Sequence, residues 1–469
     1  MAATIAQRQI LNPSRSRRWS AVELFVLIQT LSTGLLFFPE SQSYRFIIRA
    51  LPYASSIAFA LLYYNRTRRT GLPPGGALLG GALILLALNL FHSTTVFPAG
   101  IAQVAFQITI AAPMLWVALH VQDKERLERI LWLMFLTSGA SALLGLAQVF
   151  YPQIFMPEIS ALALRMDPEV IRSLSYIGSS GQQILRPPGL TDLPGGAAIG
   201  GFIAGLLGIL FGSQSGSTPI KRGFCFVLAA IGISVIYFTQ VRAFLIMLVF
   251  AIIGMCIIMA RQTRFAQTAW IGSVGAVLLI ATFTWAVTVG GKPVLDRFTS
   301  LTSEGISQSF QQNRGIFIQY TLENMLFEFP FGAGVGRWGT MNIYFGNDSS
   351  QPKPIYVEIQ MTGWLLDGGI FMWVLYGGAI IVSLWYIYRV SVSLVDVRLA
   401  YLASIVLCLN VFVVGLSFAG PAFNTQLGIQ FWLLTAALYG AARKVVPAYV
   451  TNSQRRAWPD RSDSLYGSN

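Results

Sequence analysis

The most regular pattern along the chain is a repeated run of apolar residues, each about 18 residues long or longer. An α-helix rises 1.5 Å per residue, so such a run crosses a hydrocarbon core of about 30 Å. We expect twelve membrane-spanning helices, at about 20–38, 46–64, 76–92, 97–120, 129–150, 193–212, 223–240, 243–260, 268–290, 363–388, 399–418 and 423–442. The pattern predicts an all-α polytopic membrane protein with about 12 transmembrane helices.

Two long polar segments interrupt this pattern, whereas the other connections are short. The expected organisation is a basic N-terminus (1–19), five helices (20–150), a loop (151–192), four helices (193–290), a large loop containing an amphipathic helix (291–362), three helices (363–442) and a basic tail (443–469). The two long loops fall on the same side of the membrane, so that side is expected to carry the functional surface.

Composition and charge support the membrane assignment and orient the chain. Hydrophobic residues make up 54% of the sequence and charged residues only 11%, against about 25% charged residues in soluble proteins. An even number of spans places both termini on one side, and 21 of the 32 Lys and Arg residues fall there. The positive-inside rule makes that side the cytoplasm. The net charge of +13 therefore reflects topology, and no nucleic-acid partner is expected.

Arg242 is one of the basic residues that depart from this rule. It is the single charge in "GFCFVLAAIGISVIYFTQVRAFLIMLVFAIIGMCIIMA" (223–260). One continuous helix of that length would be about 57 Å long, so we expect two spans joined by a tight turn at the outer boundary. Arg242 at this turn either reaches lipid phosphates or binds an anion in a cavity at membrane level.

A second such arginine belongs to the large loop. The stretch "NRGIFIQYTLENMLFEF" (313–329) has helical periodicity, with Gln319 and Glu323 on its polar face. The opposite face carries Phe317, Ile318, Thr321, Leu322, Met325 and Leu326. Arg314 projects from the centre of this apolar stripe, at about 100° per residue. It therefore points either into a cavity or toward lipid headgroups at a frayed helix start.

Arg186 is the third, within "ILRPPGLTDLPGGAAIGG" (184–201). Two prolines fix an extended approach to a Gly- and Ala-rich span, and Asp192 stands just before that span. Asp192 either caps the helix or orients Arg186. Three arginines at the outer ends of three segments favour a polyanionic ligand, because guanidinium groups bind phosphate oxygens in pairs and stay charged. A lipid-linked diphosphate fits this position.

The stretch "FPFGAGVGRWGT" (329–340) contains four glycines and looks like a nucleotide-binding loop. It lacks the Lys-Ser/Thr pair of a phosphate-binding loop, and no run of strands precedes it, as a dinucleotide fold requires. We expect instead that Pro330 ends the preceding helix and that the glycines turn the backbone sharply toward the site. Arg337 either adds a fourth positive group or is a surface charge.

The order of these motifs resembles the bacterial O-antigen ligases and the related Wzy-type polysaccharide polymerases. The resemblance covers roughly 180–440 and includes the acidic helix start "VEIQMTGWLLDGG" (357–369). It implies a GT-C-like fold in the bacterial plasma (inner) membrane, with the active face periplasmic. It also implies glycan transfer from an undecaprenyl-diphosphate carrier, with Arg186, Arg242 and Arg314 binding the diphosphate and neither metal nor cofactor required.

The same resemblance points to an acidic catalytic residue. Ligases of this superfamily carry a His about eleven residues before a helix glycine, and counting back from Gly369 reaches Glu358. Many of the polymerases carry Glu in that region, which favours a polymerase. Glu358 is then the candidate base for the acceptor hydroxyl, or else an interfacial charge at a helix start. Asp367 is a cavity carboxylate, an orienting partner for an arginine, or a structural residue.

Three functions stay open on the sequence alone. The first is a polymerase of carrier-linked repeat units, acting on a glycan acceptor. The second is an O-antigen ligase that transfers a finished glycan to lipid A core or to protein, and the third is a transporter of an anionic or lipid-linked substrate. Membrane lipids, a chain-length regulator and a flippase are the further partners that the first two imply. His92 and His120 end different spans, so the sequence predicts no metal site.

Overall fold

The computed structural model describes residues 19–67, 71–156, 175–177, 183–191, 194–214, 216–303, 311–346, 352–393 and 396–443. The regular secondary structure of these residues is helical apart from one antiparallel ribbon of two short strands, β1 (Ser175–Ile177) and β2 (Gln183–Leu185). Eight helical segments among them are long and apolar enough to cross a membrane. The predicted class, an all-helical multi-pass membrane protein, is confirmed at that level.

Each apolar run of the first 150 residues corresponds to helix. The helices are α2 (Ala21–Gly34), α3 (Arg45–Thr67), α4 (Gly76–Leu88), α5 (Phe97–Ala111), α6 (Pro113–His120) and α7 (Lys124–Phe150), with the short turns η2 (Leu35–Phe37), η3 (Pro39–Tyr44), η4 (Asn89–Phe91) and α8 (Pro152–Phe155) beside them. The run expected as one helix over 97–120 divides before Pro113, because proline has no N–H to continue the ladder. Asp123 begins α7 by accepting a hydrogen bond from the Arg126 backbone N–H.

The second half of the chain is also built of helices. Its helices are α10 (Gly196–Gly212), α11 (Pro219–Phe238), α12 (Arg242–Arg261), α13 (Phe265–Gly290), α19 (Gln360–Met372), η8 (Trp373–Gly377), α20 (Gly378–Ser391), α21 (Val397–Leu416), η9 (Ala422–Asn424) and α22 (Gln426–Ala442). The tight turn expected before Arg242 joins α11 to α12, with Gln240 at a φ of 55°. Small residues bring α10 and α11 together, since a methyl group on Gly201 would meet the Gly232 carbonyl oxygen at 2.5 Å.

The large loop folds into short helices. These are α14 (Lys292–Ser303), η6 (Gln311–Gly315), α16 (Ile316–Tyr320), η7 (Thr321–Met325), α17 (Leu326–Glu328) and α18 (Gly339–Phe345). The helix expected over 313–329 is present, but η6 and η7 are π-helical turns within it. It ends at Glu328 as expected, two residues before Pro330.

The glycine-rich loop that follows turns sharply, as expected, but it approaches a different element. Gly332, Gly334, Gly336 and Gly339 all have positive φ angles, which glycine adopts without steric cost. A methyl group on Gly336 would lie 2.4 Å from the Gly100 backbone nitrogen at the start of α5. The Val96 N–H donates to the Val335 carbonyl at 3.1 Å. The loop thus packs closely against the start of α5.

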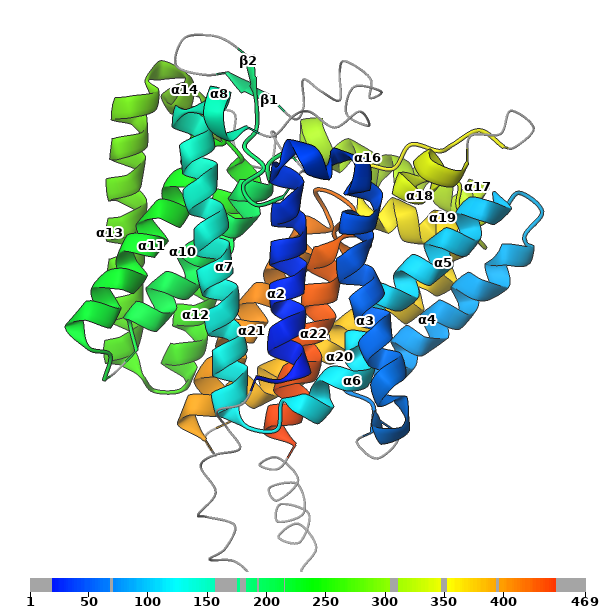
Figure 1. The fold of residues 1–469 in the computed structure, drawn as a ribbon, viewed down its shortest axis with the longest axis horizontal. Coiled ribbons are helices and arrows are strands. Elements are labelled where there is room, and N and C mark those ends of the chain that lie inside the picture. Colours follow the sequence, from blue (N-terminus) through cyan, green and yellow to red (C-terminus); the bar gives the residue numbers. More distant parts are fainter. Residues whose placement is uncertain are drawn as a thin grey trace, which may run out of the picture.

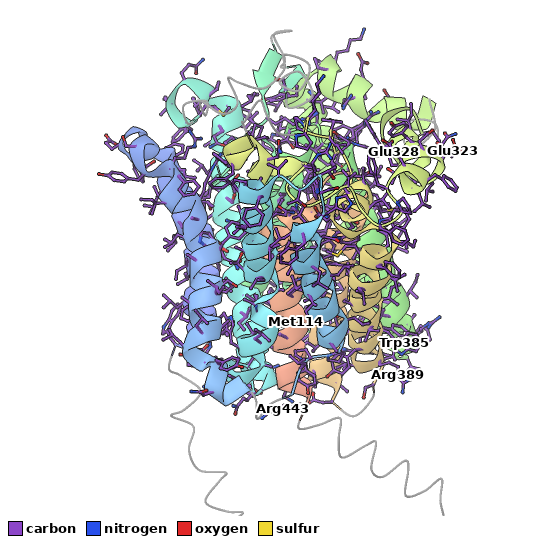
Figure 2. The ribbon with its side chains drawn as sticks, turned by 90° about the vertical axis from the view of Figure 1, so that its right-hand side faces the viewer. Met114, Glu323, Glu328, Trp385, Arg389 and Arg443 are labelled. Carbon is purple, nitrogen blue, oxygen red and sulfur yellow. The ribbon has the colours of Figure 1, made fainter. Side chains whose placement is uncertain are left out.

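The long helices stand side by side as a bundle, with α12 and α13 on one side and α4 and α5 on the other (Figure 1). The short helices α14, α16 and α18 gather at one end, which we call the loop end. Arg389 and Arg443 lie at the opposite end, and Glu323 and Glu328 lie at the loop end (Figure 2). We call the end with Arg389 and Arg443 the basic end.

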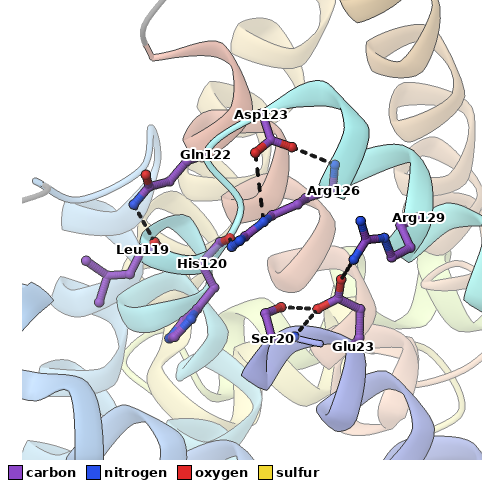
Figure 3. Close-up of polar contacts among 8 residues, drawn as sticks. All are labelled: Ser20, Glu23, Leu119, His120, Gln122, Asp123, Arg126 and Arg129. Carbon is purple, nitrogen blue, oxygen red and sulfur yellow. Dashed lines mark hydrogen bonds and ion pairs between the residues drawn. The ribbon is translucent and has the colours of Figure 1, made fainter. Parts of the chain in front are cut away.

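Ion pairs fasten the helices at the basic end. Figure 3 shows the buried Glu23 of α2 bound to Arg129 of α7 at 3.3 Å, and Asp123 beside Arg126. Lys124 pairs with Asp396 just before α21 at 2.6 Å. Arg398 of α21 also binds Glu128 of α7. Basic residues at this end therefore connect α2, α7 and α21 through acidic partners.

Candidate functional site

A large cavity of about 2340 Å³ lies toward the loop end of the bundle. Its lining includes residues of α2, α3, α5, α7, α10, α12, α14, α16, α18, α21 and α22, together with β1, η6 and the segment after β2. Arg186, Arg242 and Arg314 all line it. The structure thus brings together the three arginines that the sequence had singled out across more than a hundred residues of chain.

Each of these arginines is held by a different local structure. Arg186 follows β2 directly, and its carbonyl accepts a hydrogen bond from the Gly195 N–H at 3.3 Å. The Gln148 amide of α7 fixes the same segment by exchanging two hydrogen bonds with the Gly189 backbone, at 2.8 and 3.2 Å. Arg242 is the first residue of α12, and Arg314 belongs to the π-helical turn η6. Such turns are rare and are frequent at functional sites.

The arginines lie close enough to influence one another electrostatically. Burial, together with repulsion from Arg297, Arg314 and Arg242, lowers the pKa of Arg186 to about 10. Burial also lowers the pKa of Arg314. Arg186 remains protonated at neutral pH, and a bound anion would restore its pKa. The cluster is therefore an electrostatic site for an anion with several oxygens.

Arg297 of α14 is a fourth member of this cluster, and the sequence analysis missed it. Lys292 of the same helix also lines the cavity, and Asp296 is the one acidic residue among the described lining residues. The signal was present in the pattern of 292–303, where Val294 and Phe298 are buried four residues apart. That spacing is typical of an amphipathic helix, although the sequence predicts this segment as part of the large loop.

Glu358 lies next to the cluster, bound to one of its arginines. One carboxylate oxygen forms an ion pair with Arg314, and the other accepts a hydrogen bond from the Tyr356 hydroxyl. The Arg314 and Glu358 side chains are 34% and 20% exposed, so this pair lies at the edge of the solvent-accessible space. A carboxylate held by a guanidinium is a weak base, because the positive charge stabilises its ionised form.

No protein-family model matches the chain, and no curated protein matches it. The function must be argued from this geometry.

The remaining sequence candidates lie elsewhere. Asp367 is buried in α19, where its carboxylate accepts from the Trp338 indole N–H at 2.8 Å and from the Gln103 amide at 3.5 Å. Arg337 donates to the carbonyls of Ala333 and Lys353, at 3.2 and 3.1 Å. These contacts hold the glycine-rich loop, and neither residue is part of the described cavity lining. Asp192 falls outside the described residues.

The cavity joins the charged cluster to an apolar wall. Phe244, Met247 and Phe250 of α12 follow Arg242 at helical spacing and line the same space. Phe250 is 60% exposed, so this wall offers uncovered apolar surface. Among the described residues, no group of three His, Cys, Asp or Glu is placed to hold a metal ion. The described arrangement suits an anion that carries an apolar chain.

Proposed function

We propose that the protein is a glycosyltransferase that uses a polyprenyl-diphosphate-linked glycan, and that it polymerises repeat units of a surface polysaccharide. The observation that carries the proposal is the gathering of Arg186, Arg242, Arg297 and Arg314 around one cavity. We further propose a GT-C-like bundle of about twelve spans in a bacterial plasma membrane. Its basic end and both termini would lie in the cytoplasm, with the cavity on the extracytoplasmic side.

The arginine cluster suits the leaving group of this reaction. Breaking the bond between the sugar and the diphosphate leaves negative charge on phosphate oxygens, and positive groups aimed at that charge lower the barrier. Guanidinium groups bind phosphate oxygens in pairs and keep their charge when partly desolvated. The apolar α12 wall below Arg242 would accommodate the first part of the prenyl chain.

The ion pair between Arg314 and Glu358 suggests how the base becomes active. A diphosphate bound to Arg314 would take the place of the carboxylate, and Glu358 would then be free to accept a proton. In the transfer step, the acceptor hydroxyl loses its proton to Glu358 while its oxygen bonds to the anomeric carbon. The bond from that carbon to the diphosphate oxygen breaks, and polyprenyl diphosphate leaves.

The carrier-linked glycans that a deletion strain accumulates test the proposal. Loss of the gene should cause single carrier-linked repeat units to accumulate, and the wild-type gene should restore long chains. The Arg242→Ala gene should not restore them, although its protein reaches normal abundance in the membrane. Long carrier-linked chains that fail to be attached would instead support an O-antigen ligase. Unchanged chains in the deletion strain would contradict both enzymes.

A further inference from the structure

We propose that the cavity wall formed by α3, α18 and the start of α22 is a carbohydrate subsite, which holds the sugar next to the diphosphate. This inference rests on the proposed function and assigns a separate part of the cavity to the glycan. Helices α3 and α18 lie on one side of α2 in Figure 1, and α12 and α14, which carry Arg242 and Arg297, lie on the other side; residues of all four helices line the cavity.

Helix α3 contributes one complete face to this wall. Phe46, Arg49, Ala50 and Tyr53 all line the cavity, and their spacing of three, one and three residues places them on one side of a helix. Phe46 is 59% exposed, and the Tyr53 ring lies 4.5 Å from that of Phe106 on α5. The face therefore combines two aromatic rings with one guanidinium group.

Helix α18 presents a matching face. Thr340, Met341, Tyr344 and Phe345 line the cavity. The Tyr344 hydroxyl accepts a hydrogen bond from Arg49 at 2.9 Å, and its ring meets Phe46 edge-on at 6.0 Å. Both α3 and α18 pack against α5, so the two faces have a common support and are held in register.

Neutral polar groups complete the wall at the start of α22. Asn424, Gln426 and Gln430 line the cavity and are partly exposed. The side-chain oxygen Oδ1 of Asn424 accepts a hydrogen bond from the Gln107 side-chain amide at 2.5 Å, which fixes the Asn424 side chain against α5. Of the described lining residues on α3, on α18 and over 418–430, Arg49 is the only charged one. Helices α12 and α14, with Arg242 and Arg297, lie on the other side of α2 (Figure 1).

This separation fits the two chemically different parts of one ligand. A diphosphate needs positive charge, whereas a sugar ring offers flat C–H surfaces and many hydroxyl groups. Aromatic rings with a few placed donors and acceptors are the usual lining for such neutral, partly apolar groups. A wall that only anchored the protein among lipid headgroups would have no preference for a sugar, which makes the two functions separable.

The test compares two probes that differ only in the sugar. Purified protein in lipid nanodiscs is titrated with farnesyl diphosphate and with farnesyl-diphosphate-linked glucose, galactose and N-acetylglucosamine. In the wild type, at least one sugar should increase affinity about tenfold over farnesyl diphosphate. Tyr344→Ala and Phe46→Leu should remove that gain and leave the affinity for farnesyl diphosphate within about twofold. Tyr320→Ala, an exposed tyrosine of α16 outside the described lining, is the matched control and should keep the gain.

The outcomes distinguish this inference from the proposed function. If the wild type binds farnesyl diphosphate but no sugar increases its affinity, the carbohydrate subsite is wrong and the diphosphate site stands. The subsite is equally wrong if Tyr344→Ala keeps the gain, or if Tyr320→Ala loses it as well. If the wild type binds no farnesyl compound, the proposed function fails and this inference fails with it. Retained binding of farnesyl diphosphate shows that each variant is folded.

Discussion

The two ends of the bundle use basic residues in opposite ways. At the basic end, Arg129 pairs with Glu23 (Figure 3), and Lys124 pairs with Asp396, in each case across neighbouring elements. At the loop end, five arginines from five separate segments line one cavity, whose described lining has Asp296 as its one acidic residue. Among these arginines, Arg314 forms an ion pair with Glu358 at the edge of the cavity. Charge at the basic end joins helices, whereas charge at the loop end is gathered around a space.

The difference has an energetic consequence. Like charges brought together in a partly buried place repel each other, and this repulsion contributes to the lowered pKa of Arg186. An anion that binds among these arginines would reduce this repulsion. Bound diphosphate should therefore stabilise the folded protein by mass action.

The largest effect is expected from removing one cavity arginine. Arg242→Ala or Arg314→Ala should weaken farnesyl diphosphate binding by about 10- to 150-fold, because a hydrogen bond to a charged group contributes about 1.5–3 kcal/mol. Chain extension should be lost with it. Titration of the purified variants measures the affinity, and Lys124→Met at the basic end is the matched control. Equal affinities in all three variants would remove the distinction between the two ends.

The second largest effect concerns the acidic partner of Arg314. Glu358→Gln should abolish chain extension, because glutamine cannot take the acceptor proton. The same change should tighten farnesyl diphosphate binding about three- to tenfold, since Arg314 no longer pairs with a competing carboxylate. A loss of turnover together with tighter farnesyl diphosphate binding would support a base at this position, because the loss of a residue that only supports the fold should not tighten binding. Glu323→Gln, which removes a surface carboxylate bonded to Gln319, is the control and should change neither turnover nor affinity. Weaker farnesyl diphosphate binding in Glu358→Gln would contradict the replacement of this carboxylate by diphosphate at Arg314.

A smaller effect, on stability alone, is expected at Asp367. Asp367→Ala leaves the indole N–H of Trp338 without its buried partner, at a cost of about 1–3 kcal/mol. Asp367→Asn retains an acceptor oxygen and should cost less. The melting temperature measured in detergent should be highest for the wild type, lower for Asp367→Asn and lowest for Asp367→Ala. Farnesyl diphosphate affinity should stay near the wild-type value in the folded fraction, and a large loss of affinity in Asp367→Asn would place this residue in the site.

The smallest effect is expected from one ion pair at the basic end. Lys124→Met removes the contact with Asp396, whose side chain is 23% exposed, and pairs so close to solvent contribute about 0.2–1 kcal/mol. The melting temperature should fall by a degree or two, with unchanged ligand affinity. A marked loss of affinity in this variant would show that the two ends are coupled.

The sequence was most informative about helices and least informative about contacts. Apolar runs predicted the helices, because a chain in lipid must satisfy its backbone hydrogen bonds internally. The sequence also singled out Arg186, Arg242 and Arg314, because a charge within an apolar pattern is conspicuous. The convergence of these side chains depends on helix packing, which periodicity does not encode. The ion pair of Arg314 with Glu358, 44 residues further on, has no local signal.

Other differences came from residues that interrupt a regular pattern. Pro113 divided a run that hydropathy alone makes continuous, and Gly368 and Gly369 place a kink inside α19. Arg297 is not among the predicted site residues, because its helix is short and polar and hydropathy does not distinguish such a helix from the rest of the loop. Three roles for Asp367 are compatible with the sequence: a cavity carboxylate, an orienting partner for an arginine, or a structural residue. Its carboxylate contacts Trp338 and Gln103, which lie far from it in the sequence and give no local signal.

Incubation of the purified protein with synthetic polyprenyl-diphosphate-linked repeat units, with products measured by mass, tests the central claim most directly. The account predicts products that grow by whole repeat units, one polyprenyl diphosphate released per bond, activity that persists in a metal chelator, and no growth with Arg242→Ala. Substrate masses that stay unchanged with wild-type protein that binds the substrate would contradict it. Counterflow of that substrate in proteoliposomes would then identify a transporter.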